Sequence, residues 1–280
     1  MLRTTQNAPQ RLLRGGAWIV GSGRHRRARG YHCLVSPTAI AAQPGADARC
    51  FALVPCAGVG ERAGQALPKQ YAAVAGRAMV AHTLDALSRV ARLQATLVVL
   101  APGDGWFEAQ VPAFVGEAAW VARCGGATRA ATVAAGLEEL RRRGARDTDW
   151  VLVHDAARCL LRPEWVDRLI DACLADAVGG LLALPLADTL KQSRAGRVQC
   201  TLSRSDKWAA QTPQMFRLGL LRQALARAGV GVTDEARAVE ALGQAPLLVP
   251  GELENFKLTW PQELLLATRL LESREREART

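Results

Sequence analysis

Short apolar segments alternate with segments of helical periodicity from residue 50 onward, and this alternation restricts the possible folds more than any other feature. The apolar runs of strand length cover residues 50–56, 95–101, 120–123, 150–154 and 180–185. The segments with helical periodicity cover residues 79–90, 128–143 and 163–177. Strands that are apolar on both faces are normally buried between two layers of helices. The pattern therefore predicts an α/β fold with a Rossmann-like, mostly parallel sheet flanked by helices.

A polar segment interrupts this alternation at about residues 187–209. Its apolar residues alternate roughly with polar ones, and residues 194–197 (R-A-G-R) form a turn candidate, so we expect a protruding β-hairpin arm. A two-stranded arm is barely stable by itself. We therefore expect it to pack on a second subunit and to serve dimerisation. The elements expected beyond it are helices at 218–228 and 234–242, a strand at 255–259 and a last helix from Pro261.

Most of the excess positive charge lies at the N-terminus. The chain has 280 residues and a net charge of +10, and residues 1–48 contribute +6 through seven arginines and one acidic residue. Because this stretch is rich in Gly, Pro and Ala and has no sustained apolar period, it predicts a disordered basic leader before a single domain at 49–280. The leader is either an organelle transit peptide, which makes a plastid location possible, or an extension without function.

The remaining charge of +4 does not require a polyanionic partner, and we expect neither nucleic acid nor membrane as a partner. An RNA-binding module stays open as an alternative because the overall charge is high. No run of about 18 apolar residues predicts a transmembrane helix. Seven cysteines without a C-x-x-C pair predict a reducing compartment, the bacterial cytoplasm, and no zinc site. Cys50, Cys56 and Cys124 are expected in the core.

The loop after the first predicted strand combines small residues with two cations. Ala57, Gly58 and Gly60 let backbone N–H groups approach an anion, and Arg62 and Lys69 add positive charge. A tight turn with two solvated bases is the alternative. The P-loop motif is absent, and the dinucleotide fingerprint fails because a proline at position 68 interrupts the helix it requires.

Two further loops follow predicted strands at the same edge of the sheet. The first contains Gly126 and Arg129, followed by Thr132, and can read a base or sugar; a threonine at position 128 is expected to cap the next helix. The second contains Asp155, which suits a divalent cation or a substrate hydroxyl, and Arg158, which suits a phosphate. Mutual pairing of these two side chains is the alternative. The histidine at position 154 is interpreted as structural.

These loops carry a resemblance to a known family. The segments V-P-C-A-G-V-G-E-R-A, L-P-K-Q-Y, G-G-x-x-R, V-H-D-A-A-R, D-T-L-K, R-S-x-x-W-x-x-Q-T-P-Q, T-D-E-A and N-F-K-L-T-x-P-x-E-L occur in this order. Together they resemble the 2-C-methyl-D-erythritol 4-phosphate cytidylyltransferases of the non-mevalonate isoprenoid pathway. The resemblance covers about four-fifths of the chain and leaves out the leader.

The resemblance implies an enzyme that transfers CMP from CTP to 2-C-methyl-D-erythritol 4-phosphate with Mg²⁺ as cofactor, and it assigns roles to individual positions. It implies that Arg62 and Lys69 stabilise the transition state. The residues implied to position the sugar phosphate are Arg204, Lys257, Asp155, Arg158, Thr189 and Thr212. The positions implied for CTP are Ala57, Gly58, Gly60, Gly126, Arg129 and Thr132, the last in place of a family serine. The metal ligands are not assigned.

The same resemblance implies a homodimer in which the arm reaches the partner's site, bringing Thr189 and Arg204 with it. Two positions depart from the family pattern: Ala127 stands where many members have an acidic residue, and Cys159 where proline is common. A sibling enzyme that uses ribitol 5-phosphate as the acceptor is an alternative from the same class.

Overall fold

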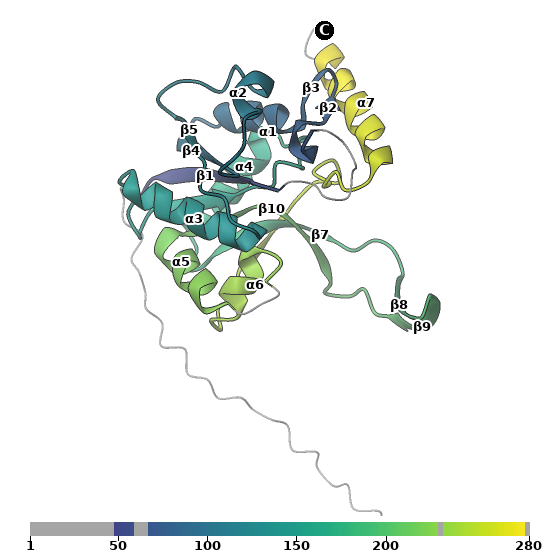
Figure 1. Cartoon of the computed structure of the whole chain (residues 1–280). Coiled ribbons are helices and arrows are strands. Elements are labelled where there is room, and N and C mark those ends of the chain that lie inside the picture. The colour runs from purple at the N-terminus through teal and green to yellow at the C-terminus, as the bar shows by residue number, and fades with distance from the viewer. Residues whose placement is uncertain (1–47, 59–66, 229–231, 278–280) are drawn as a thin grey trace, which may run out of the picture. The chain divides into compact units, whose positions relative to one another are not determined.

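Seven strands form the central sheet of the computed structural model, in the order β11-β7-β10-β6-β1-β4-β5 (Figure 1). The model describes residues 48–58, 67–228 and 232–277. The strands are β1 (Cys50–Cys56), β4 (Leu93–Leu100), β5 (Ala119–Ala122), β6 (Trp150–Val153), β7 (Gly179–Pro185), β10 (Trp208–Arg217) and β11 (Leu247–Pro250). Strand β10 alone pairs antiparallel with its neighbours in this sheet. The mostly parallel α/β fold is confirmed.

Helices cover both faces of this sheet. The helices of the described residues are α1 (Met79–Ser88), α2 (Phe107–Gln110), α3 (Arg129–Arg142), α4 (Pro163–Leu174), α5 (Leu218–Arg227), α6 (Glu235–Glu240) and α7 (Pro261–Glu277), of which α7 packs beside β2 instead. In β1, Ala52 and Val54 pack with α1 and α4, whereas Phe51 and Leu53 pack with α3 and α5. Because successive side chains of a strand point to opposite faces, a strand between two helical layers is apolar throughout, as the sequence pattern requires.

Short elements complete the chain. A 3₁₀ turn, η1 (Lys69–Tyr71), precedes the small hairpin of β2 (Ala73–Val74) and β3 (Arg77–Ala78). The predicted arm is present as the antiparallel pair β8 (Leu190–Arg194) and β9 (Arg197–Leu202), and it leaves the sheet beyond the ends of β7 and β10 (Figure 1). Ala195 and Gly196 both have positive φ angles, 51° and 75°, as a tight hairpin turn requires. Every residue of β9 is exposed.

One prediction about the C-terminal third is wrong, and one strand there was not predicted. The strand expected at 255–259 is absent; instead Arg158 and Ala157 bind the backbone of this segment through the Asn255 carbonyl and the Leu258 N–H. The edge strand is instead β11, which lies earlier in the chain at Leu247–Pro250. Strand β10 was missed because its buried residues include Gln211, Thr212 and Gln214, which give no apolar pattern.

One cysteine also lies differently from the prediction. Cys50 and Cys56 are buried in β1, but Cys124 is exposed, because it lies past the end of β5 in a loop at the open edge of the sheet. The basic leader at 1–48 falls outside the described residues except for Ala48. Among the described residues, no helix is long and apolar enough to cross a membrane.

A buried carboxylate anchors the start of β6. The side chain of Asp149 is 0% exposed and accepts hydrogen bonds from the Arg49 backbone N–H (3.1 Å), the Arg49 guanidinium (2.6 Å) and the Arg146 backbone N–H (2.8 Å). Burial opposes its charge, but these donors outweigh burial and lower the pKa of Asp149 to about 2. The bonds tie the chain ahead of β1 to the chain ahead of β6.

Asp149→Asn should therefore lower the free energy of unfolding by about 2–4 kcal/mol, since it leaves a guanidinium facing an amide at a buried site. Asp147→Asn, at a position that is 57% exposed, is the matched control and should cost less than about 0.5 kcal/mol. Urea unfolding measures both.

The same carboxylate predicts a pH dependence with a definite sign. Since its pKa is depressed in the folded state, its stabilisation is complete above the ordinary value of 3.8 and is lost as the pH falls from there towards 2. The unfolding free energy of Asp149→Asn should fall less steeply than that of the parent over this interval. Equal slopes would show that Asp149 does not provide this dependence.

Candidate active site

The loops that follow β1, β4 and β5 meet closely at the carboxyl edge of the sheet. The Gly125 N–H donates to the Leu100 carbonyl at the end of β4 (2.8 Å). A Cβ atom added at Gly125 would lie 2.2 Å from the Ala57 Cβ and 2.7 Å from the Leu100 oxygen. Only glycine fits between these two loops. This places Ala57, in the loop after β1, against Gly125, the residue that precedes Gly126.

The hydroxyl of Thr132 organises the loop that contains Gly126. Its Oγ1 accepts from the Gly126 N–H (3.1 Å) and lies 2.9 Å from the Thr128 carbonyl, to which it donates. The side chain is buried, so it shapes the loop from within. Thr128 caps α3 as predicted, because its side-chain oxygen accepts from the Ala131 N–H (3.0 Å).

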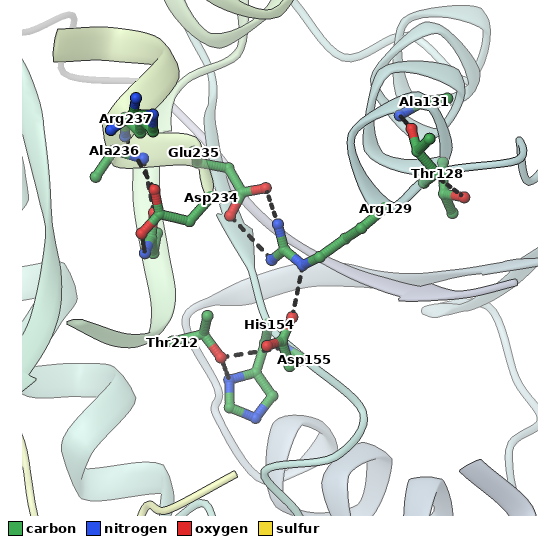
Figure 2. A network of polar contacts seen from close by, with 12 residues as sticks. Thr128, Arg129, Ala131, His154, Asp155, Thr212, Asp234, Glu235, Ala236 and Arg237 are labelled. Atoms are coloured by element: carbon green, nitrogen blue, oxygen red, sulfur yellow. Dashed lines mark hydrogen bonds and ion pairs between the residues drawn. The ribbon is translucent and has the colours of Figure 1, made fainter. Parts of the chain in front are cut away.

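A cluster of four charged side chains lies past the end of β6, and Figure 2 shows three of them, Arg129, Asp155 and Glu235. The Asp155 carboxylate binds Arg129 Nε through Oδ1 (2.8 Å) and Lys257 Nζ through Oδ2 (2.9 Å). Both terminal nitrogens of Arg129 also donate hydrogen bonds to the Glu235 carboxylate, at 2.6 and 3.0 Å. Glu235 is almost completely buried, and its bidentate ion pair with Arg129 holds α6 to α3. The Arg129–Asp155 pair joins α3 to the turn after β6. The alternative that Asp155 only pairs with Arg158 is wrong.

Burial and charge act in opposite directions in this cluster. Burial disfavours the charged form of Asp155, but Arg129 and Lys257 outweigh it and hold the pKa of the carboxyl well below its usual range. Burial likewise disfavours the charge of Arg129, but Glu235 and Asp155 outweigh it and raise the pKa of the guanidinium. Both groups are therefore charged at neutral pH.

Arg158 points into backbone carbonyls. Its Nη1 donates to the Asn255 carbonyl (2.6 Å) and its Nη2 to the Ala210 carbonyl (3.2 Å). Burial lowers the pKa of Arg158. Its planar fork therefore ties the turn after β6 to β10 and to the segment that carries Lys257.

The two residues that follow Lys69 fix the position of its backbone. The Gln70 side chain donates to the Cys56 carbonyl at the end of β1 (3.2 Å), and the Tyr71 hydroxyl donates to Asp104 in the loop after β4 (2.7 Å). The Lys69 ammonium reaches the Thr259 carbonyl (3.3 Å), two residues from Lys257. Segments nearly 190 residues apart in sequence thus bring two lysines to one side of the site.

Other predicted residues do not join this cluster. Gly60 and Arg62 lie outside the described residues. Thr189 and Arg204 are exposed at the base of the arm, and over the described ranges no side-chain hydrogen bond or ion pair links them to the cluster. Thr212 is buried behind Asp155.

Sequence reasoning missed Glu235 and Asn255. Glu235 follows Asp234, whose side chain caps α6, and an acid at that place usually serves the helix terminus. Asn255 is fully buried, and its Nδ2 donates to the Thr212 carbonyl (2.8 Å). A polar residue inside the predicted strand at 255–259 was the available signal.

Comparisons with known proteins agree on one family. The family model described as 2-C-methyl-D-erythritol 4-phosphate cytidylyltransferase matches residues 50–273. A protein of that name from Bordetella petrii is 55% identical over 226 residues, which are 79% of this chain and 98% of that protein. A "Bifunctional enzyme IspD/IspF" from Albidiferax ferrireducens is 56% identical over 241 residues, which are 86% of this chain but 57% of that protein. The chain thus spans little more than half of the bifunctional relative.

Solved structures agree with the sequence comparisons. A 4-diphosphocytidyl-2C-methyl-D-erythritol synthase matches with a TM-score of 0.72 and 41% identity, covering 80% of this chain and 99% of the other. The 2-C-methyl-D-erythritol 4-phosphate cytidylyltransferase of Thermus thermophilus matches with a TM-score of 0.65 and 34% identity, over 79% of this chain and 98% of the other.

Gly125→Ala should lower the free energy of unfolding by about 1–3 kcal/mol, because the new methyl group overlaps Ala57 and a backbone carbonyl. Gly103→Ala is the control, since a Cβ there meets nothing within 4 Å. Urea unfolding compares them. Equal, small losses in both variants would contradict the close contact of the two loops.

Proposed function

The chain belongs to the 2-C-methyl-D-erythritol 4-phosphate cytidylyltransferase family, and from this membership we propose that residues 49–280 form one domain that transfers CMP from CTP to 2-C-methyl-D-erythritol 4-phosphate. The products are 4-diphosphocytidyl-2-C-methyl-D-erythritol and pyrophosphate. The observation that carries the proposal is the convergence of Lys69, Arg129, Asp155 and Lys257, from four separate segments, at the carboxyl edge of the sheet.

The proposed reaction is an in-line displacement. A phosphate oxygen of the acceptor attacks the α-phosphorus of CTP, and the bond to pyrophosphate breaks. Negative charge builds up on the α-phosphoryl oxygens, and Lys69 and Arg62 stabilise it in the transition state. Lys257, Arg158 and Asp155 hold the acceptor. Two cations and a carboxylate can bind its phosphate and a hydroxyl.

We propose that the backbone N–H groups of Ala57, Gly58, Gly60 and Gly126 approach the nucleotide, in the region that Thr132 and Gly125 shape. Small residues allow this approach. Arg129, which the family resemblance assigns to CTP, uses three of its five N–H groups on Asp155 and Glu235. Its contribution to CTP binding therefore comes from the two N–H groups that remain.

We propose that Mg²⁺ enters as part of the CTP substrate. Triphosphate oxygens are ligands that Mg²⁺ prefers, and the bound ion offsets the charge of two phosphorylated substrates. Among the described residues, no group of three or more His, Cys, Asp or Glu side chains is placed to hold a metal ion. Both oxygens of Asp155 already bind cations.

We propose that the arm dimerises the protein and delivers Thr189 and Arg204 to the partner's site. The arm exposes Val198 (64%) and Leu202 (41%), apolar side chains that a second subunit can cover. The proposed location is the bacterial cytoplasm. The relatives reported above are bacterial proteins and give no support to a plastid leader.

Pyrophosphate release from CTP, Mg²⁺ and 2-C-methyl-D-erythritol 4-phosphate tests the proposed function. A preference for ribitol 5-phosphate as the acceptor would replace it with the sibling activity. Deleting residues 1–48 should leave the rate unchanged, whereas an RNA-binding module that depends on the basic leader would lose its affinity for RNA.

Lys69→Ala and Arg62→Ala should each lower kcat about a hundredfold or more with a smaller change in the KM for CTP, because both groups act mainly in the transition state. Arg227→Ala removes an exposed cation from α5 and is the control. Steady-state kinetics separates the two constants. Near-normal kcat in both site variants would refute the assignment.

Arg204→Ala should raise the KM for the sugar phosphate. If the arm acts in the partner's site, mixing this variant with Arg62→Ala restores activity, because one site of the mixed dimer then has an intact Arg62 and an intact partner arm. Refolding the two variants together and measuring turnover tests this. Activity no higher than the average of the separate variants would show that the arm acts within its own subunit.

A further inference from the structure

His154 and Thr212 lie next to Asp155, at the start of the 155–158 turn (Figure 2). His154 is 0% exposed and Thr212 is 4% exposed. The Thr212 Oγ1 accepts from the Asp155 backbone N–H (3.1 Å) and lies 3.0 Å from the His154 Nδ1. The His154 Nε2 lies 3.2 Å from the Arg158 carbonyl oxygen. The contacts therefore run from one end of the turn to the other.

The partners determine where the proton of the imidazole is. A carbonyl oxygen only accepts hydrogen bonds, so the Nε2 facing Arg158 must carry a hydrogen. Burial lowers the pKa of His154 to about 4, so the ring is neutral at pH 7 and its Nδ1 has no proton. The Thr212 hydroxyl then donates to Nδ1 while it accepts from Asp155. Every contact has one donor and one acceptor.

We propose that His154 is a positioning residue whose neutral Nε2–H ring, together with the Thr212 hydroxyl, forms a hydrogen-bonded strap that closes the 155–158 turn and holds Asp155 and Arg158 in place. The strap consists of Asp155 N–H, Thr212 Oγ–H, the His154 ring and the Arg158 carbonyl. It rests on the proposed function, because it acts on the two residues proposed to hold the acceptor.

The strap changes the role expected of Thr212. Family resemblance implies that Thr212 contacts substrate, but its only donor hydrogen points to His154 and one acceptor site is used by Asp155. Thr212 also lies on β10, where pairing with β7 is irregular between Ala210 and Gln214. Its effect on the acceptor is therefore transmitted through the backbone of the turn. Inside the protein, a lost bond of this kind is not replaced by water.

The first experiment measures the tautomer in the unmodified protein. Long-range ¹H–¹⁵N correlation spectra of the histidine rings, with His154→Gln to assign the signal, should show His154 as a neutral Nε2–H ring at pH 7. An Nδ1–H ring or an imidazolium would overturn the proposal. This measurement needs no substrate, so it stands whether or not the chain has cytidylyltransferase activity.

The second experiment measures kinetics with CTP and the sugar phosphate. Thr212→Val and His154→Phe keep the approximate shape of each side chain and remove the strap, and each should raise the KM for the sugar phosphate about tenfold, the equivalent of one buried hydrogen bond. The KM for CTP should change less than about threefold. Thr212→Ser restores the hydroxyl and should behave like the parent. Thr96→Val is the control for a buried threonine elsewhere in the sheet.

The double variant separates the strap from a direct contact. If both side chains act through one strap, Thr212→Val combined with His154→Phe should be no worse than the worse single variant. Multiplying effects, or a normal KM in His154→Phe with a raised KM in Thr212→Val, would show that Thr212 contacts substrate independently and would overturn the proposal. Urea unfolding confirms that each variant is folded. Where a variant does not fold, the tautomer of His154 in the unmodified protein remains the test of the strap.

Discussion

The Asp155 carboxylate is the contact on which the arrangement of the site depends. Its two oxygens bind Arg129 at the start of α3 and Lys257 in the segment before α7, while its backbone N–H is held by Thr212 of β10. A parallel sheet aligns the ends of its strands but does not orient the loops that follow them. Here one ionised side chain, in a mostly buried position, joins loops that enter from three different parts of the chain.

The apolar strands of the sheet and the helices that cover it could be predicted from sequence, because the pattern of apolar residues that marks each of them is local. Strand β1 has the bounds expected from its apolar run, and α1, α3 and α4 begin at or within one residue of their predicted starts. Strand β10 could not be found in this way. Its buried Gln214 is satisfied by Asp234 and by the Ala236 N–H, partners that are distant in sequence. A polar strand in the core has no apolar pattern, since its burial depends on partners in the finished fold.

In the candidate site too, local sequence patterns indicate some residues, whereas their partners depend on the finished fold. Lys69, Asp155 and Arg158 stand out as candidate site residues in loops that follow predicted strands, and Lys257 is indicated by the family resemblance. Their partners could not be predicted. Nothing local in the sequence indicates that Glu235 accepts hydrogen bonds from both terminal nitrogens of Arg129. Nor does it indicate that the Arg158 guanidinium donates to two backbone carbonyls. Such bonds depend on which segments the topology brings together.

The two cations on Asp155 differ in what it costs to move them. Arg129 is 27% exposed and is held by a second, almost fully buried carboxylate, so displacing it would leave Glu235 without its counter-ion in the core. Lys257 is 45% exposed and its contact with Asp155 is a single ammonium–carboxylate pair. Water reaches the Lys257 ammonium, so breaking this pair costs less than displacing Arg129. On the function proposed above, the phosphate of the acceptor can compete for Lys257 while Arg129 keeps Asp155 in place. The cluster of two cations and two carboxylates would then have no net charge before binding and would still present a cation to the proposed substrate.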